Sequence, residues 1–268
     1  MKFSGLRAYS ILYLLFLYAP ILLLPLFAFN DGTVIAFPLR GFTTDWFAQM
    51  AGNASLRRAV GNSLIIAIST AVLATALGIF AARATTRYRF PAKGGIMGLV
   101  MLPLVLPEII VAMSLLVVLL ALGIELSLLT VILGHTLLCL PYTIAILSTA
   151  FNALDQSLEE AAYDLGETKI GAFRLVILPM VMPGIISSLL MSFTISLDEF
   201  IIAFFLAGSQ PTLPTYIFSQ LRFPAAVPVV MALGTVLVAL SILLLTLAEF
   251  FRRRGVARTG QSNSGGFL

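Results

Sequence analysis

Residues 151–179 read FNALDQSLEEAAYDLGETKIGAFRLVILP and separate two long apolar runs, residues 128–150 and 179–203. Both runs have the length of about 20 residues that a helix needs to cross the hydrocarbon core of a bilayer. The stretch between them carries acids and basic residues. We therefore expect residues 151–178 to form a loop outside the membrane.

This loop has the pattern of a short helix, a sharp corner and a second helix. Ser157 and Glu160 are spaced as a capping box, which predicts a helix start. Apolar residues follow at i, i+3, i+4 and i+7 on one helical face: Leu158, Ala161, Ala162 and Leu165. Gly166 predicts the end of this helix, and a second amphipathic stretch leads to Pro179. A rigid projection of this kind suits docking into the cleft of a partner protein.

The composition of the whole chain places most of it inside a membrane. Of its 268 residues, 60% are hydrophobic and 10% are charged, whereas soluble domains carry about 25% charged residues. The mean hydropathy is +1.05. The formal charge of +4 comes from basic residues that lie between apolar runs, which is typical of topogenic charge rather than of nucleic-acid binding. The chain is therefore predicted to be an all-α membrane protein.

About six apolar runs are long enough to span the bilayer. They lie near residues 8–29, 59–82, 97–122, 128–150, 179–203 and 226–249. We interpret residues 1–254 as a single transmembrane domain, and the Gly-, Ser- and Asn-rich residues 255–268 as a disordered cytoplasmic tail. In the second run, small residues spaced four apart predict close helix packing: Ala67 with Ala71, and Ala74 with Gly78 and Ala82.

The Lys and Arg residues orient the chain. With a cytoplasmic N-terminus, most of the 16 basic residues fall on inner segments: Lys2, Arg7, Arg83, Arg87, Arg89, Lys93, Lys169, Arg174, Arg252, Arg253, Arg254 and Arg258. The outer segments hold Arg40, Arg57, Arg58 and Arg222. This distribution satisfies the positive-inside rule. An even number of spans then places both termini in the cytoplasm.

The loop also carries a specific resemblance. Residues 160–162 read EAA, Gly166 follows four residues after Ala162, and Leu178-Pro179 closes the segment. This pattern resembles the EAA signature of permease subunits of bacterial binding-protein-dependent ABC importers, with Val176 where the family usually has Ile. Further segments look like the second permease subunit of spermidine/putrescine-type importers: FTTDWF (42–47), RYRFPAK (87–93), LPEIIVAMSLL (106–116), FTISLDEFIIAFF (193–205) and TLPTYIFSQLRF (212–223).

The resemblance implies the permease fold of a type I ABC importer in the bacterial inner membrane, moving polyamines by alternating access. It implies two ATPase subunits, a second homologous permease and a periplasmic binding protein as partners. It also implies that the loop docks in a groove of the ATPase through Ser157, Glu160, Ala161, Ala162, Leu165 and Gly166. The chain lacks a glycine-rich phosphate loop, so we expect no enzyme activity and no cofactor here, with ATP and Mg bound by the ATPase.

Three acids inside the apolar runs are candidates for the path of the cargo. Glu108 follows Pro103 and Pro107, where the loss of backbone donors predicts a kink or an unwound turn. Asp198 and Glu199 lie toward the outer end of the fifth run. A carboxylate in hydrocarbon is costly, so each should face the bundle interior or water, where it would lower the barrier for a polycation. The alternative for Asp198 and Glu199 is a structural role, in which they cap a helix or pair with Arg222.

Other chemistries have weaker support in the sequence. His135 has no Cys or acid at ligand spacing, so we expect a packed, hydrogen-bonded histidine and no metal site. A different cargo of the same transporter class stays open, namely iron, thiamine, sulfate or phosphonate. A stand-alone secondary transporter or channel is the rival from another class. It predicts internal repeats with paired broken helices, which the sequence does not show.

Overall fold

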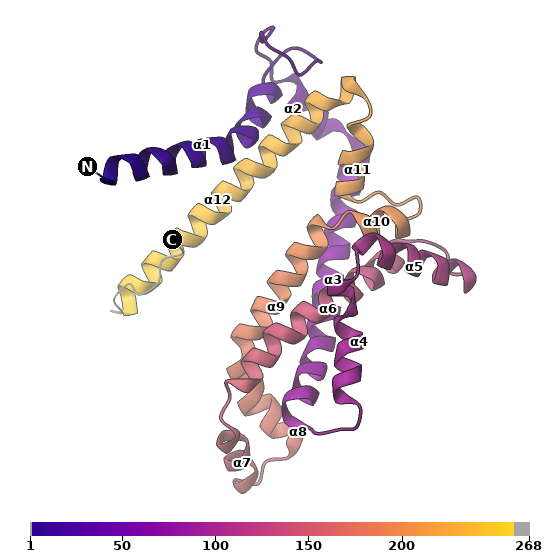
Figure 1. The fold of residues 1–268 in the computed structure, drawn as a ribbon, viewed down its shortest axis with the longest axis vertical. Helices are drawn as coiled ribbons and strands as arrows, with labels where there is room; N and C mark the ends of the chain where they lie inside the picture. The colour runs from indigo at the N-terminus through magenta and orange to yellow at the C-terminus, as the bar shows by residue number, and fades with distance from the viewer. Residues whose placement is uncertain (1, 260–268) are drawn as a thin grey trace. The chain divides into compact units, whose positions relative to one another are not determined.

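The computed structural model describes residues 2–259, and the regular secondary structure in that range is helical (Figure 1). Two compact units are present, and each is described by itself. The first contains the described residues up to Asn53 together with those from Ile217, and the second is Ala54–Tyr216. The expectation of an all-α protein is confirmed for the described range.

The first unit is built around the last helix of the chain. Its elements are α1 (Lys2–Ala28), α2 (Asp45–Gly52), a 3₁₀ turn (Pro224–Ala226) and α12 (Val227–Thr259). Both α1 and α2 pack against α12. The connection between α1 and α2 is fixed by the Trp46 indole, whose Nε1 donates to the backbone oxygen of Asn30 at 2.9 Å.

The second unit has α3 as its central helix. Its elements are α3 (Ala54–Arg87), α4 (Lys93–Val105), α5 (Glu108–Ala121), α6 (Leu128–Asn152), α7 (Gln156–Asp164), α8 (Lys169–Ala172), a π-helical turn (Phe173–Ile177), α9 (Leu178–Asp198) and α10 (Ile201–Leu206). The unit boundary falls inside α11 (Leu213–Gln220). Both α6 and α9 pack along α3.

Small residues on α3 allow this packing, as the sequence predicts. The stripe from Ala67 to Ala82 is buried. A Cβ at Gly78 would lie 2.8 Å from the Cβ of Thr143 on α6, so a larger residue would push the two helices apart. The Thr143 hydroxyl donates to the Ala74 carbonyl at 3.1 Å across the same contact. The predicted close contact is therefore confirmed, and its partner is α6.

The number of candidate spans agrees with the prediction of about six. Five helices in the described range are long and apolar enough to cross a membrane, and the pair α4 and α5 makes a sixth if it counts as one broken span. This pair bends by 110° between Val105 and Glu108. The break consists of Leu106 and Pro107, and the proline has no backbone N–H to continue the helix. The kink predicted at the two prolines is therefore found at Pro107, whereas α4 continues through Pro103.

Two helix boundaries differ from the prediction. The fifth span, expected over 179–203, begins earlier, because helix runs from Lys169 to Asp198, and it breaks before α10. The last helix continues to Thr259, five residues into the predicted tail. The prediction of disorder rested on the Gly, Ser and Asn content of the tail. It did not take into account that the Arg and Ala residues near the start of the tail have good helix propensity. Residues 260–268 of the predicted tail lie outside the described residues.

Candidate functional site

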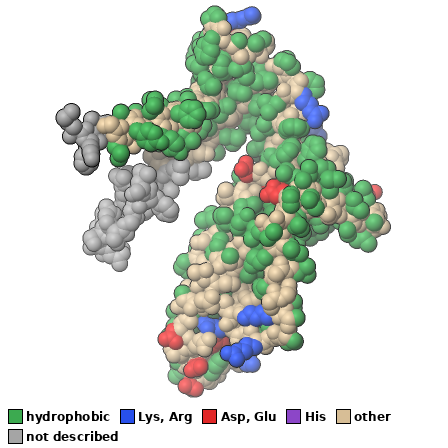
Figure 2. Space-filling view, in the orientation of Figure 1, with side chains coloured by type: hydrophobic (Ala, Val, Ile, Leu, Met, Phe, Trp, Pro, Cys, Tyr) green, Lys and Arg blue, Asp and Glu red, His purple; other side chains and the backbone are tan. Residues whose placement is uncertain are grey.

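The projection predicted for residues 151–178 is present at one end of the second unit, where α7 and α8 lie beyond the last turns of α3 and α6 (Figure 1). Figure 2 shows charged side chains of both signs gathered at this end, whereas the rest of the unit shows mainly hydrophobic side chains with a few acidic ones. The base of the projection is held by an apolar cluster of buried residues: Ala82, Leu147, Phe151, Ile177, Val181 and Ile185. The loop is therefore a folded element that is anchored by this apolar cluster.

The start of α7 differs in detail from the sequence prediction. The N-cap is Asp155, whose carboxylate accepts the backbone N–H of Ser157 at 3.0 Å. This hydrogen bond lowers the pKa of Asp155. The predicted capping box of Ser157 and Glu160 is wrong, because Asp155 stands two residues earlier and satisfies the first N–H groups with a charged oxygen. Glu160 is exposed on α7 and free for other contacts.

Gly166 ends α7 as predicted. Its φ is +88°, a left-handed conformation that glycine adopts without strain. The N–H of Glu167 donates to the carbonyl of Ala162 at 3.0 Å, and the N–H of Gly166 donates to that of Tyr163 at 2.9 Å. This pair of bonds is a Schellman motif, which satisfies the last carbonyls of the helix. The corner is therefore fixed by backbone geometry.

The apolar stripe of α7 is divided between the inside and the outside of the projection. Ala162 is buried against the rest of the loop, whereas Leu158 and Ala161 are exposed. Beyond the helix, Leu165 is 88% exposed and Ile170 on α8 is 79% exposed. Large apolar side chains presented together at an aqueous end are a feature of interaction surfaces. The exposure agrees with the expectation that this loop meets a partner.

The residue that ties α7 to the body of the unit is Glu159, which no sequence pattern above singles out. Glu159 on α7 lies 2.6 Å from Arg83 Nη2 and 3.9 Å from Arg87 Nε, both in the last turns of α3. The Tyr163 hydroxyl donates to the same carboxylate at 2.7 Å. We call Glu159, Arg83 and Arg87 the clamp. The sequence did contain one indication of this contact. Arg83 and Arg87 are four residues apart at the end of a predicted span, so they share one helix face and could bind one carboxylate.

The electrostatics of the clamp favour the ionised carboxylate. Partial burial acts to raise the pKa of Glu159, but the hydrogen bonds from Tyr163 and Arg83, with the charges of both arginines, outweigh it and lower that pKa. The bond to Glu159 in turn raises the pKa of the Tyr163 phenol. The clamp is thus charged at neutral pH.

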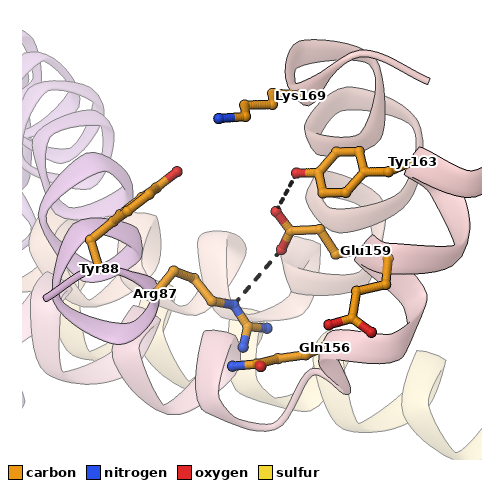
Figure 3. A pocket seen from close by; sticks show the side chains of 7 residues that line it. Arg87, Tyr88, Gln156, Glu159, Tyr163 and Lys169 are labelled. Atoms are coloured by element: carbon orange, nitrogen blue, oxygen red, sulfur yellow. Dashed lines mark hydrogen bonds and ion pairs between the residues drawn. The ribbon is translucent and has the colours of Figure 1, made fainter. Parts of the chain in front are cut away.

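A pocket of about 270 Å³ opens beside the clamp. It is lined by Arg87, Tyr88, Gln156, Glu159, Glu160, Tyr163 and Lys169. Figure 3 shows Glu159 between Arg87 and Tyr163, with Tyr88 and Lys169 across the pocket from it. Two acids and two basic residues share this lining, so the pocket has no strong preference for a ligand of either charge.

A second carboxylate, Glu199, is buried at the break between α9 and α10. It is 8% exposed and accepts the backbone N–H groups of Ile202 at 3.0 Å and Ala203 at 3.2 Å. Its Oε2 lies 3.1 Å from Nε2 of His135 on α6. Of the structural roles considered for Glu199, helix capping is therefore observed, and the basic partner is His135 in place of Arg222.

The remaining candidates behave differently. The other ring nitrogen of His135 is 2.7 Å from the Ser196 hydroxyl, so the expectation of a hydrogen-bonded histidine is confirmed. Glu108 is the first residue of α5 and is exposed, and Asp198 is the last residue of α9 and is also exposed. The three predicted acids thus divide into one buried and paired, and two open to their surroundings. Among the described residues, no three His, Cys, Asp or Glu side chains are grouped to hold a metal.

Comparison with known proteins decides the family. The profile of the family described as "Binding-protein-dependent transport system inner membrane component" matches residues 74–256, which include the whole projection. The chain belongs to this family. It is therefore a permease subunit of an ABC importer, a non-catalytic component of the bacterial inner membrane.

Two curated relatives cover most of this permease. The spermidine/putrescine transport system permease protein PotC of Haemophilus influenzae is 35% identical over 240 residues, or 89% of this chain and 93% of that protein. The putrescine transport system permease protein PotI of Escherichia coli K12 is 37% identical over 230 residues, or 83% of this chain and 81% of that protein.

A solved structure supports the fold of the permease. A chain of a bacterial ABC transporter that imports the acidic polysaccharide alginate aligns with a TM-score of 0.71 and 14% identity, covering 93% of this chain and 97% of that chain. At this identity the likeness concerns the fold alone. The ABC importer permease fold that the sequence predicts is confirmed, and a binding-protein-dependent system implies an ATPase and a binding protein as partners.

Proposed function

We propose that this permease imports polyamines of the putrescine and spermidine type. The observation that carries the proposal is the pair of relatives at 35% and 37% identity, whose names assign them to spermidine and putrescine transport and whose similarity runs over more than four fifths of both chains. A match to a probable molybdenum ABC transporter permease of Haloferax volcanii is shorter, at 33% identity over 65% of this chain.

The proposed assembly contains this permease, a similar but distinct permease, two ATPase subunits and a periplasmic binding protein. ATP-driven closure of the ATPase subunits moves the projection, and the paired permeases turn from inward-facing to outward-facing. The exposed Leu165 and the fixed corner at Gly166 support docking, because they present a stiff apolar surface to the ATPase. Ser157, Glu160 and Ala161 are exposed on the same helix and complete the proposed contact.

Two acids support passage of a polycation. Glu108 and Asp198 are exposed, and each stands at a helix end beside a break. A cation that leaves bulk water loses part of its hydration, and a nearby carboxylate offsets that loss. We assign Glu199 a structural role, because its oxygens already contact His135 and accept backbone N–H groups at the start of α10. It holds the break near which Asp198 lies.

The cargo is tested by uptake into vesicles that contain the purified four-subunit complex, with ATP inside and the binding protein outside. Radiolabelled putrescine and spermidine should enter, and unlabelled polyamine should compete. Ferric iron, thiamine, sulfate, molybdate and a phosphonate should not compete at the same concentrations. Uptake of one of these in place of polyamine would overturn the cargo while leaving the permease assignment intact.

A further inference from the structure

The central helix α3 is continuous across the second unit. Its 34 residues contain no proline, whereas α6 contains Pro141, α9 contains Pro183, and α4 and α5 are separated by a sharp bend. From Ser63 to Arg83 the helix rises about 30 Å, which is the thickness of a bilayer core. Among the membrane-crossing elements of this unit, α3 is the one built as an unbroken rod.

The outer half of α3, between two and three turns from its first residue, is bonded to the chain at the start of α11. The Asn62 side chain donates through Nδ2 to the carbonyl of Pro211 at 2.9 Å. The Ser63 hydroxyl accepts the backbone N–H of Leu213 at 2.8 Å. Between these two contacts, Thr212 is buried. Two side chains in adjacent positions of α3 therefore hold residues 211–213 in place.

The inner end of α3 is bonded to the loop at several points. In addition to the ion pair with Glu159, the Arg83 guanidinium lies 5.1 Å from the centre of the Phe173 ring. Arg87 Nη2 donates to the carbonyls of Phe151 at 3.4 Å and Leu154 at 3.2 Å, just before α7. The last two turns of α3 thus contact the chain on both sides of α7 and α7 itself.

The covalent route from α7 into the membrane is indirect, because the chain turns between α7 and α9. It passes through Gly166, then the four-residue α8 with Gly171, and then the π-helical turn before α9. Short π segments inside helices are rare and are frequently found at functional sites. The ion pair from α7 to α3, by contrast, joins the loop helix directly to a straight helix.

We propose that the clamp of Glu159 with Arg83 and Arg87 is the contact through which α7 moves α3, and that α3 carries the movement to residues 211–213, which are bonded to its outer half. The three clamp residues are positioning residues, because they act through α3 and not on the cargo. The inference rests on the proposed docking of α7 with an ATPase. It adds a specific route for the signal and a residue, Glu159, that lies beside the EAA segment.

The test separates hydrolysis from transport in the vesicle system described above. Glu159→Gln and Arg83→Gln remove charge from the clamp and leave the outward faces of α7 unchanged. Both variants should hydrolyse ATP at close to the wild-type rate, yet import at least about fivefold less cargo per ATP, the lower range of an allosteric coupling. Asp164→Asn is the matched control, because it removes an exposed carboxylate at the end of the same helix, and it should keep the wild-type ratio.

Exchanging the charges at positions 83 and 159 tests whether a loss of import reflects the missing ion pair or a general disturbance of the structure. Arg83→Glu combined with Glu159→Arg restores an opposite-charge contact, with Arg87 one turn away on α3. Import per ATP should recover in the double variant and should be low in each single variant. A second restoration uses Arg83→Cys with Glu159→Cys joined by a short, reducible bifunctional thiol reagent, since the native Cys139 is buried. Import per ATP should rise after cross-linking and fall again after reduction.

Two outcomes would overturn the inference. One is a wild-type import-to-ATP ratio in Glu159→Gln and Arg83→Gln, and the other is failure of both charge exchange and cross-linking to restore it. A failure of the proposed docking of α7 with the ATPase would give a different result. In that case Gly166→Asp, which disturbs docking itself, would also import normally. If Gly166→Asp abolishes import while the clamp variants keep the wild-type ratio, docking stands and the clamp route is rejected.

Discussion

Two carboxylates of the second unit, Glu159 and Glu199, each lie against a basic side chain, but in opposite surroundings. Glu159 is partly buried at the charged end of the unit and joins a loop helix to the end of α3. Glu199 is buried between helices, pairs with His135, and supplies the acceptor for two backbone N–H groups at a helix break. The first pair connects two elements that must move together. The second supplies carboxylate acceptors for backbone N–H groups that have no helical carbonyl partner at the break.

The largest effect is expected at the corner that orients the Glu159 helix. Gly166→Asp should abolish import while the protein still inserts, chiefly because the added charge meets the docked partner, with a smaller contribution from the strain of a side chain at a φ of +88°. A Cβ there would meet no atom of this chain within 4 Å, so internal packing is not the cause. Uptake and membrane content should be measured together. Gly166→Asn, which tolerates a left-handed φ and adds no charge, is the control and should keep part of the activity.

A large loss of stability is expected at the other carboxylate. Glu199→Ala leaves the His135 ring nitrogen and two backbone N–H groups without their acceptor. Each buried polar group left unsatisfied costs about 1–3 kcal/mol, so the total is about 3 kcal/mol or more. The thermal unfolding midpoint in detergent should fall by roughly 6–10 °C. Adding His135→Ala should cost less in the Glu199→Ala background than alone, because contacting residues are not additive. The neighbouring Asp198→Ala should leave the midpoint nearly unchanged, and an equal fall there would contradict the comparison.

A moderate effect on import is expected at the exposed acids. Asp198→Asn and Glu108→Gln keep size and most hydrogen bonding but remove a charge from the proposed path. Polyamine import should slow at least several-fold, since a desolvated charge contact is worth more than about 1 kcal/mol. Cargo binding to the isolated binding protein is the control and should not change. Normal import by both variants would assign these acids a structural role.

The smallest effect is expected from pH at the clamp. A carboxylate whose pKa is lowered by folding contributes stability above its unfolded pKa of about 4.3, and that contribution is lost as pH falls through the lowered value. Import per ATP should therefore not vary through Glu159 when the cytoplasmic side is set between pH 6 and pH 8. A midpoint inside this range that disappears in Glu159→Gln would show that the ion pair is much weaker than its geometry indicates.

Sequence alone predicted what depends on composition and on local spacing. The spans, the kink at Pro107, the corner at Gly166 and the helical loop over 151–178 all follow from patterns within a few residues. It did not predict the partners of Glu159 and Glu199. Arg83 lies 76 residues from Glu159, and His135 lies on another helix than Glu199, so these pairs depend on how α3, α6 and α9 pack. The cap at Asp155 was missed for a simpler reason, since a second cap pattern two residues later also fitted.

The most direct test of the account is the dependence of import on the ATPase. Radiolabelled putrescine uptake should be compared in vesicles that hold the full complex and in vesicles that hold the two permeases without ATPase subunits. The account predicts uptake only in the first, and only with ATP inside and the binding protein outside. Saturable putrescine uptake by the permeases alone, driven by an ion gradient or by the cargo gradient, would contradict it.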